Sequence, residues 1–183
     1  MVATLRQRRR SLPDLAISTI IGFCSFLYLT GGKILNPSNN KWLFGIDSDA
    51  NFIGWQFFRR TPILQFPIGN SPNLGTGFAS SVVYTDSIPL LAIPFKFLNF
   101  LLPNAFHYFG LWVLVCFVLQ TVFAFRLLKH WMDDRTSAHL ASVFFVIAPC
   151  FLFRFSVGAN GHLALCGQFL VLWAMHLLLQ SQH

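Results

Sequence analysis

The sequence predicts an all-α membrane protein with about four transmembrane helices and a long outer loop that carries interfacial helices. Of its 183 residues, 55% are hydrophobic and only 10% are charged, whereas soluble domains carry about 25% charged residues. Apolar runs long enough to cross a bilayer recur along the chain. The arginines Arg6, Arg8, Arg9 and Arg10 directly precede the first run. This favours a topology signal over a nucleic-acid-binding arm, so the bilayer and not a nucleic acid is the expected partner.

The apolar runs define the predicted spans. The first span is 15–35, which follows a basic N-terminal segment, 1–14, and lacks the cleavage site of a signal peptide. The second span, 108–128, is long enough to cross about 30 Å of hydrocarbon. The third, 138–153, is short and has a proline near its end, which neighbouring helices can accommodate. The fourth is 163–180.

Charge asymmetry predicts the orientation. The positive-inside rule places the basic N-terminus in the cytoplasm, and with it the turn 129–137. The loops 36–107 and 154–162 then lie outside. The apolar segment 88–102 leaves an alternative open, but as a helix it would rise only about 22 Å. We therefore expect it to lie in the outer membrane surface rather than to span the membrane.

Polar candidates begin early in the outer loop 36–107. Asp47 and Asp49 stand just before a predicted short helix, and Asp49 is a good helix cap. Aromatic residues recur along one face of this helix, and we expect them at headgroup level. Arg59 and Arg60 end the helix, where they either contact lipid headgroups or bind a substrate.

Three further residues complete the candidate set. Thr85 or Asp86 is predicted to be the N-cap of the interfacial helix, a structural role that competes with a functional role for Asp86. Arg154 lies in the second outer loop, and its planar fork suits a phosphate group. His162, in the same loop, is either a hydrogen-bonding site residue or the first residue of a helix.

The cysteines predict neither a disulfide nor a zinc site. All four fall in or beside apolar runs, and none form a C-x-x-C pair. We expect them to be buried thiols, because cysteine behaves as a small hydrophobic residue.

Several stretches carry a resemblance to known families. They are Asp47, GWQFFR at 54–59, FPIG at 66–69, TDSIPLLA at 85–92, FK at 95–96, LP at 102–103, YFGLW at 108–112, CFVLQ at 116–120, Arg154 and HLAL at 162–165. Over nearly its whole length the chain is similar to a family of uncharacterised bacterial multi-span membrane proteins. In architecture alone it resembles the C-type glycosyltransferase superfamily, whose members use polyprenyl-phosphate sugars.

This resemblance implies a membrane glycosyltransferase that works on the outer face of the bacterial cytoplasmic (inner) membrane. Asp47 corresponds to the catalytic carboxylate, a general base, with Asp49 second, and Arg59, Arg60 or Arg154 would hold the donor phosphate. The D-x-D motif accompanies a divalent cation in some members, but two carboxylates alone make a poor metal site. Because members are several times longer, the chain resembles an N-terminal fragment that associates with other membrane chains.

Two other functions stay open. A lipid or solute transporter of the flippase type predicts ionisable residues at mid-membrane, where the spans offer only Gln120, Gln168 and His176. A non-catalytic, truncated membrane subunit is the third interpretation.

Overall fold

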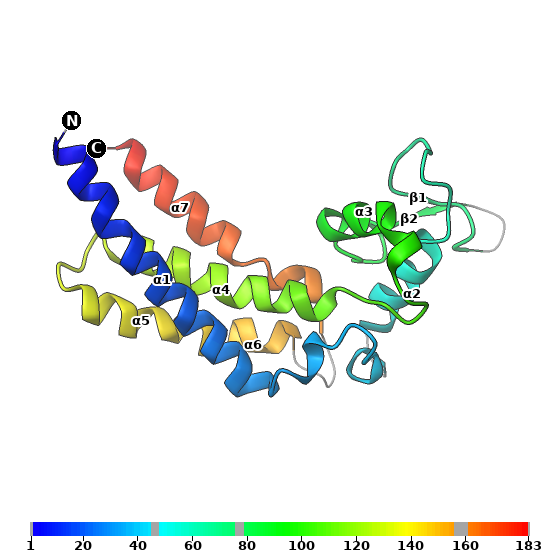
Figure 1. Ribbon diagram of the computed structural model, residues 1–183, viewed down its shortest axis with the longest axis horizontal. Helices are drawn as coiled ribbons and strands as arrows, with labels where there is room; N and C mark the ends of the chain where they lie inside the picture. The colour runs from blue at the N-terminus through cyan, green and yellow to red at the C-terminus, as the bar shows by residue number, and fades with distance from the viewer. Residues whose placement is uncertain (1, 45–47, 76–78, 156–160, 183) are drawn as a thin grey trace. The chain divides into compact units, whose positions relative to one another are not determined.

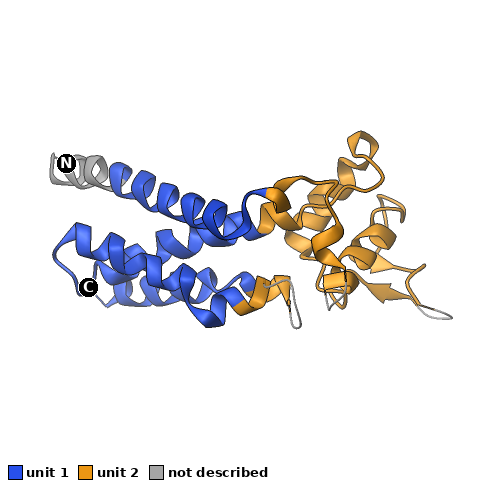
Figure 2. Ribbon diagram, turned by 90° about the horizontal axis from the view of Figure 1, so that it is seen from below, with its two compact units in different colours: residues 1–32, 113–152, 166–183 blue, residues 33–112, 153–165 orange. Residues whose placement is uncertain are grey.

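The computed structural model in Figure 1 describes residues 2–44, 48–75, 79–155 and 161–182, with side chains from residue 12 onward. Helices account for 66% of the structure and strands for 2%, which confirms the all-α class. The chain forms two compact units, coloured separately in Figure 2. Unit 1 contains residues 1–32, 113–152 and 166–183, and unit 2 contains residues 33–112 and 153–165.

Unit 1 is built almost entirely from helices. The helices that contribute to it are α1 (Val2–Thr30), α4 (Phe109–Leu128), α5 (Arg135–Ile147), α6 (Pro149–Phe155), the 3₁₀ turn η4 (Leu163–Cys166) and α7 (Phe169–Ser181). Within the described part of the chain, three helical segments are long and apolar enough to cross a membrane. They are Leu12–Thr30, Phe109–Leu128 and Leu163–Ser181. The chain therefore has the helices of a membrane protein.

The predicted third span is broken. The helices α5 and α6 pass the same test only as a pair, and they are bent by 46°. The bend falls at Ala148, where the backbone leaves the helical region just before Pro149. Proline lacks the N–H that would continue the helical ladder, which explains the break. Four spans, as predicted, are reached only if this pair counts as one.

Small residues allow the helices of unit 1 to approach closely. A Cβ added at Gly22 of α1 would lie 2.7 Å from the Cα atom of Val118 on α4. Beside this contact, the hydroxyl of Thr121 donates to the carbonyl of Ser18 at 2.8 Å. Small side chains and hydroxyl hydrogen bonds are the usual means of helix association in membranes.

Unit 2 contains mostly short elements. They are η1 (Lys33–Leu35), η2 (Lys41–Leu43), α2 (Ser48–Phe58), β1 (Asn70–Ser71), β2 (Ser80–Ser81), α3 (Pro89–Phe97) and η3 (Asn99–Leu101). The two strands pair antiparallel, with Asn70 opposite Ser81. The sequence predicts that the aromatic face of α2 lies at the level of the lipid headgroups. This prediction is wrong, because Phe52, Trp55 and Phe58 are buried in the core.

The apolar segment 88–102 folds as α3 followed by η3. The nine residues of α3 rise about 14 Å, too little to cross about 30 Å of hydrocarbon. Leu90 and Phe97 are exposed, whereas Ala92 and Lys96 are buried within the unit. The short length and the exposed apolar side chains favour a helix that lies at the membrane surface.

Candidate functional site

Asp86 is not the helix cap that the sequence predicts. The N-cap of α3 is Ile88, and no side chain caps this helix. Pro89 occupies the first turn, and a proline there removes one of the N–H groups that a cap would satisfy. The carboxylate of Asp86 therefore does not cap α3.

The turn around Asp86 is held in an unusual conformation. Asp86 and Ile88 have φ angles of 49° and 51°, in the left-handed region that a β-branched residue rarely adopts. Such a residue costs about 1–3 kcal/mol and persists only where neighbours over-determine it. Here Asn51 donates to the carbonyl of Asp86 at 3.1 Å, and Ser87 donates back to the carbonyl of Asn51 at 2.8 Å. The hydroxyl of Tyr108 donates to the carbonyl of Ser87.

Gly54 allows α2 to lie directly against this turn. A Cβ at this position would lie 2.1 Å from Oγ1 of Thr85 and 2.7 Å from Oγ of Ser87. No residue other than glycine fits at this contact without a shift of the turn. The conformation of Asp86 therefore depends on α2 as well as on its own segment.

The structure brings Asp86 together with His162. Nδ1 of His162 lies 4.0 Å from Oδ2 of Asp86, and the two side chains are 39% and 53% exposed. The segment before His162 is held because Ser48, the first residue of α2, donates to the carbonyl of Gly161 at 3.1 Å. Behind it, the indole of Trp112 donates to the carbonyl of Leu163 at 2.7 Å. Residues from two predicted outer loops thus form one exposed carboxylate–imidazole pair.

Of the two aspartates of the D-x-D motif, the structure describes only Asp49. Asp49 is half-buried in the first turn of α2, one residue after the helix begins, where its charge complements the helix dipole. Asp47, the residue that the resemblance makes catalytic, lies outside the described residues, so its role stays a prediction. Within the described part of the chain, no group of three metal-ligating side chains could hold a metal ion.

Arg59 is buried and holds neighbouring backbone in place. It therefore does not have the predicted role of contacting lipid headgroups or a substrate. Its side chain is only 6% exposed and donates to Oδ1 of Asn99 at 2.6 Å. Its guanidinium also donates to the carbonyls of Pro103 at 3.0 Å and Asn104 at 3.2 Å. Burial and then the charge of Arg60 lower the pKa of Arg59. An arginine remains charged all the same, so Arg59 clamps this irregular segment to the end of α2.

The other two predicted cations remain accessible. Arg60 is exposed just after α2, and Arg154 is half-buried in the last turn of α6. Either could meet a phosphate group through its planar fork. The sequence assigned no role in the site to Asn51, Ser87 or Tyr108, although the last two lie in the stretches that carry the resemblance. No local pattern marks residues whose partners lie far along the chain.

The fold and site define a helical protein with helices long and apolar enough to cross a membrane, and with an exposed carboxylate–imidazole pair. The chain belongs to the family described as a domain of unknown function (DUF6311), whose model matches residues 19–183. No curated protein and no solved structure matches the chain. All of the candidate residues lie within the matched range.

Proposed function

We propose that the chain is part of a membrane glycosyltransferase that takes a sugar from a polyprenyl-phosphate donor on the outer face of the bacterial cytoplasmic membrane. The observation that carries this proposal is the Asp86–His162 pair, whose partly exposed side chains lie 4.0 Å apart. An imidazole with a carboxylate beside it is a recurrent general base. The membrane-capable helices would keep the unit beside a donor that dissolves in lipid.

In this proposal His162 accepts the proton of an acceptor hydroxyl while the hydroxyl oxygen attacks the anomeric carbon of the sugar. The new glycosidic C–O bond forms as the C–O bond to the phosphate breaks, and polyprenyl phosphate leaves with the bonding electron pair. Asp86 stabilises the imidazolium that results, as the aspartate does in serine hydrolases. General base catalysis of this kind contributes about 10²–10⁴-fold in rate.

Cations are needed for the phosphate end of the donor. Arg60 and Arg154 are the described candidates, because Arg59 is occupied by backbone carbonyls. Arginine pairs with phosphate through two parallel hydrogen bonds and offsets the charge that develops on the leaving group. The resemblance assigns the base to Asp47 instead, with Asp49 second, and the two assignments give different mutant profiles.

A transfer assay tests the proposal. Full-length protein is reconstituted in vesicles with labelled polyprenyl-phosphate sugar and a soluble acceptor, and the labelled product is counted. We expect Asp86→Asn and His162→Gln to reduce transfer at least about 10²-fold. Asp133→Asn, in the turn 129–137, is the matched control and should keep full activity. Arg60→Gln and Arg154→Gln should raise the KM for the donor.

Each result separates the alternatives. Full activity in both Asp86→Asn and His162→Gln, with loss in Asp47→Asn, moves the base to Asp47. A wild-type protein that transfers no sugar from any polyprenyl-phosphate donor overturns the proposal. If the same vesicles move lipid or solute, the transport interpretation replaces it, and if they do neither, the chain is a non-catalytic subunit.

A further inference from the structure

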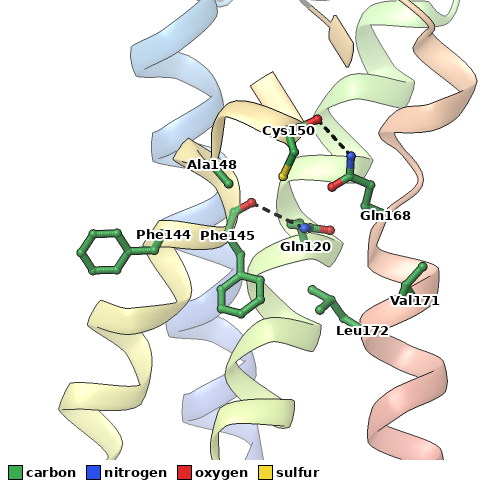
Figure 3. Close-up of a pocket in the computed structure, with 8 residues that line it drawn as sticks. All are labelled: Gln120, Phe144, Phe145, Ala148, Cys150, Gln168, Val171 and Leu172. Carbon is green, nitrogen blue, oxygen red and sulfur yellow. Dashed lines mark hydrogen bonds between the residues drawn. The ribbon is translucent and has the colours of Figure 1, made fainter. Parts of the chain in front are cut away.

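Unit 1 contains an open groove that the proposed transfer reaction does not use. It lies between α4, the break between α5 and α6, and the start of α7 (Figure 3). Its volume is about 590 Å³. This volume is within the range of about 300–1,000 Å³ that is usual for ligand sites. Its lining is apolar apart from the carboxamides of Gln120 and Gln168 and the thiol of Cys150. The lining residues carry no charge.

The two carboxamides donate hydrogen bonds to backbone carbonyls beside the helix break. Pro149 lacks an N–H, so the carbonyl of Phe145, four residues earlier, loses its helical donor. Nε2 of Gln120 donates to this carbonyl at 3.5 Å. Nε2 of Gln168 donates to the carbonyl of Cys150 at 3.2 Å. The carboxamide oxygens are therefore left for other partners.

The oxygen of Gln120 has no such partner. The Gln120 side chain is only 3% exposed, and its Oε1 atom accepts no hydrogen bond from any described residue. In Figure 3 the side chains of Gln120 and Gln168 point toward one another across the groove. A buried acceptor in apolar surroundings is costly unless a donor reaches it. The groove therefore lacks one component, a hydrogen-bond donor.

We propose that this groove binds the hydrocarbon chain of a neutral membrane amphiphile whose hydroxyl or amide N–H donates to Oε1 of Gln120. Helices long and apolar enough to cross a membrane flank the groove, so in a bilayer lipid chains would surround it. The uncharged lining offers no partner for a charged headgroup. The inference depends on the helices lying in a bilayer and not on sugar transfer.

A transmembrane helix fits the groove less well than a flexible chain. Helices approach closely through small residues on both surfaces. The groove instead presents Phe144, Phe145 and Leu172, and Ala148 is the small residue among its lining side chains. A flexible chain can follow such an uneven surface because it has no rigid backbone to fit.

Two native thiols provide the test. Cys150 is exposed in the groove, and Cys24, exposed on α1, is not among the lining residues. Full-length protein in lipid nanodiscs is labelled with a maleimide in the presence of hexadecanol or its methyl ether, and each site is quantified by mass spectrometry. We expect hexadecanol to slow labelling of Cys150 but not of Cys24. The ether lacks the donor and should protect about two- to tenfold more weakly, the equivalent of one net hydrogen bond.

Three variants define the outcome. Gln120→Leu should remove the difference between alcohol and ether while both still protect Cys150. Ala148→Trp fills the groove, so neither compound should change the labelling rate. Leu140→Trp, on an exposed position of α5 outside the lining, should behave as wild type.

Other results overturn the proposal. Equal protection by alcohol and ether in wild type removes the role of Gln120, and no protection at all removes the site. A Cys24→Ser protein that forms Cys150–Cys150 disulfides on oxidation, insensitive to either compound, shows that a second copy of the chain covers the groove instead.

Discussion

The two units differ in what many of their polar side chains bond to, although unit 1 also has long-range contacts such as that of Thr121 with Ser18. In unit 1 the hydroxyls of Thr30 and Ser142 donate to carbonyls of their own helices, at 2.8 and 2.7 Å. In unit 2 the indole of Trp55 donates to the carbonyl of Phe106 at 2.9 Å, and Arg59 reaches carbonyls more than 40 residues away. A helix satisfies its own backbone, whereas irregular segments need side chains for the same purpose.

Lys96 shows how far unit 2 depends on such side chains. It is buried, its Nζ atom donates to the hydroxyl of Thr61 at 2.6 Å, and it lies 4.2 Å from the ring centroid of Phe58. Burial lowers the pKa of this ammonium group. A cation stabilised by a hydroxyl and an aromatic face, at the end of a short helix, holds that helix to its neighbour. Single side chains therefore carry more of the stability in unit 2 than in unit 1.

The largest expected difference is between two tryptophans. Trp55 is fully buried in unit 2, whereas Trp173 in unit 1 is 43% exposed. Trp55→Ala should destabilise unit 2 by about 3–5 kcal/mol, because it leaves a cavity and removes the shorter of two hydrogen bonds to the carbonyl of Phe106. Trp173→Ala should cost about 0.5–1 kcal/mol. Hydrogen exchange in detergent micelles measures both, and equal losses would contradict the comparison.

The adjacent arginines give the next largest effect. Arg59→Leu removes the charged hydrogen bonds to Asn99 and to the carbonyls of Pro103 and Asn104, and should cost about 2–3 kcal/mol. Arg60→Leu, at an exposed position, should change stability by about 0.5 kcal/mol or less. Thermal unfolding combined with limited proteolysis of unit 2 measures the difference in stability between the two variants. A stable Arg59→Leu protein would mean that water replaces the clamp.

A pair of glycines tests whether the turn around Asp86 is pre-organised. Gly54→Ala should cost about 1–3 kcal/mol and reduce activity as well, since its Cβ would lie 2.1 Å from Thr85. Gly69→Ala is the matched control, because its nearest neighbours lie at 3.3 Å. Both variants are compared by thermal unfolding and in the transfer assay. Unchanged activity in Gly54→Ala would separate the conformation of Asp86 from function.

The smallest effect concerns a helix cap in unit 1. Asp134 accepts hydrogen bonds from the backbone N–H and hydroxyl of Ser137, at 2.7 and 2.6 Å. These bonds, led by that of the hydroxyl, lower the pKa of Asp134. Its stabilisation is therefore present above about pH 4, the ordinary range of an aspartate, and is lost as pH falls further.

The matching measurement compares Asp134→Ala with Asp133→Ala. The first variant should lower the thermal midpoint slightly at pH 7 and should flatten its dependence on pH below about 4. The second variant keeps the Asp134 cap and should follow the wild-type curve. A wild-type slope in Asp134→Ala would assign the acid sensitivity to another group.

The sequence was informative wherever a local pattern was enough. Apolar length predicted the helices that include 108–128 and 163–180, and the proline at 149 marked a weak third span. The sequence misled wherever a partner lay far away. A pattern of aromatics at helical spacing cannot distinguish a face that meets lipid from one that meets a protein core. For that reason the sequence wrongly predicted an exposed aromatic face for α2, and an exposed position for Arg59.

What the sequence determined by itself is the helical, apolar character of the chain and the residue types available for chemistry. Hydrophobic length and charge are local properties, and they are readable without a partner. Tertiary structure alone decided which residues meet. Asp86 faces His162 because α2, the turn at 85–88 and the segment at 161–163 are joined by hydrogen bonds across long stretches of chain. Such contacts depend on packing, which no spacing along the sequence records.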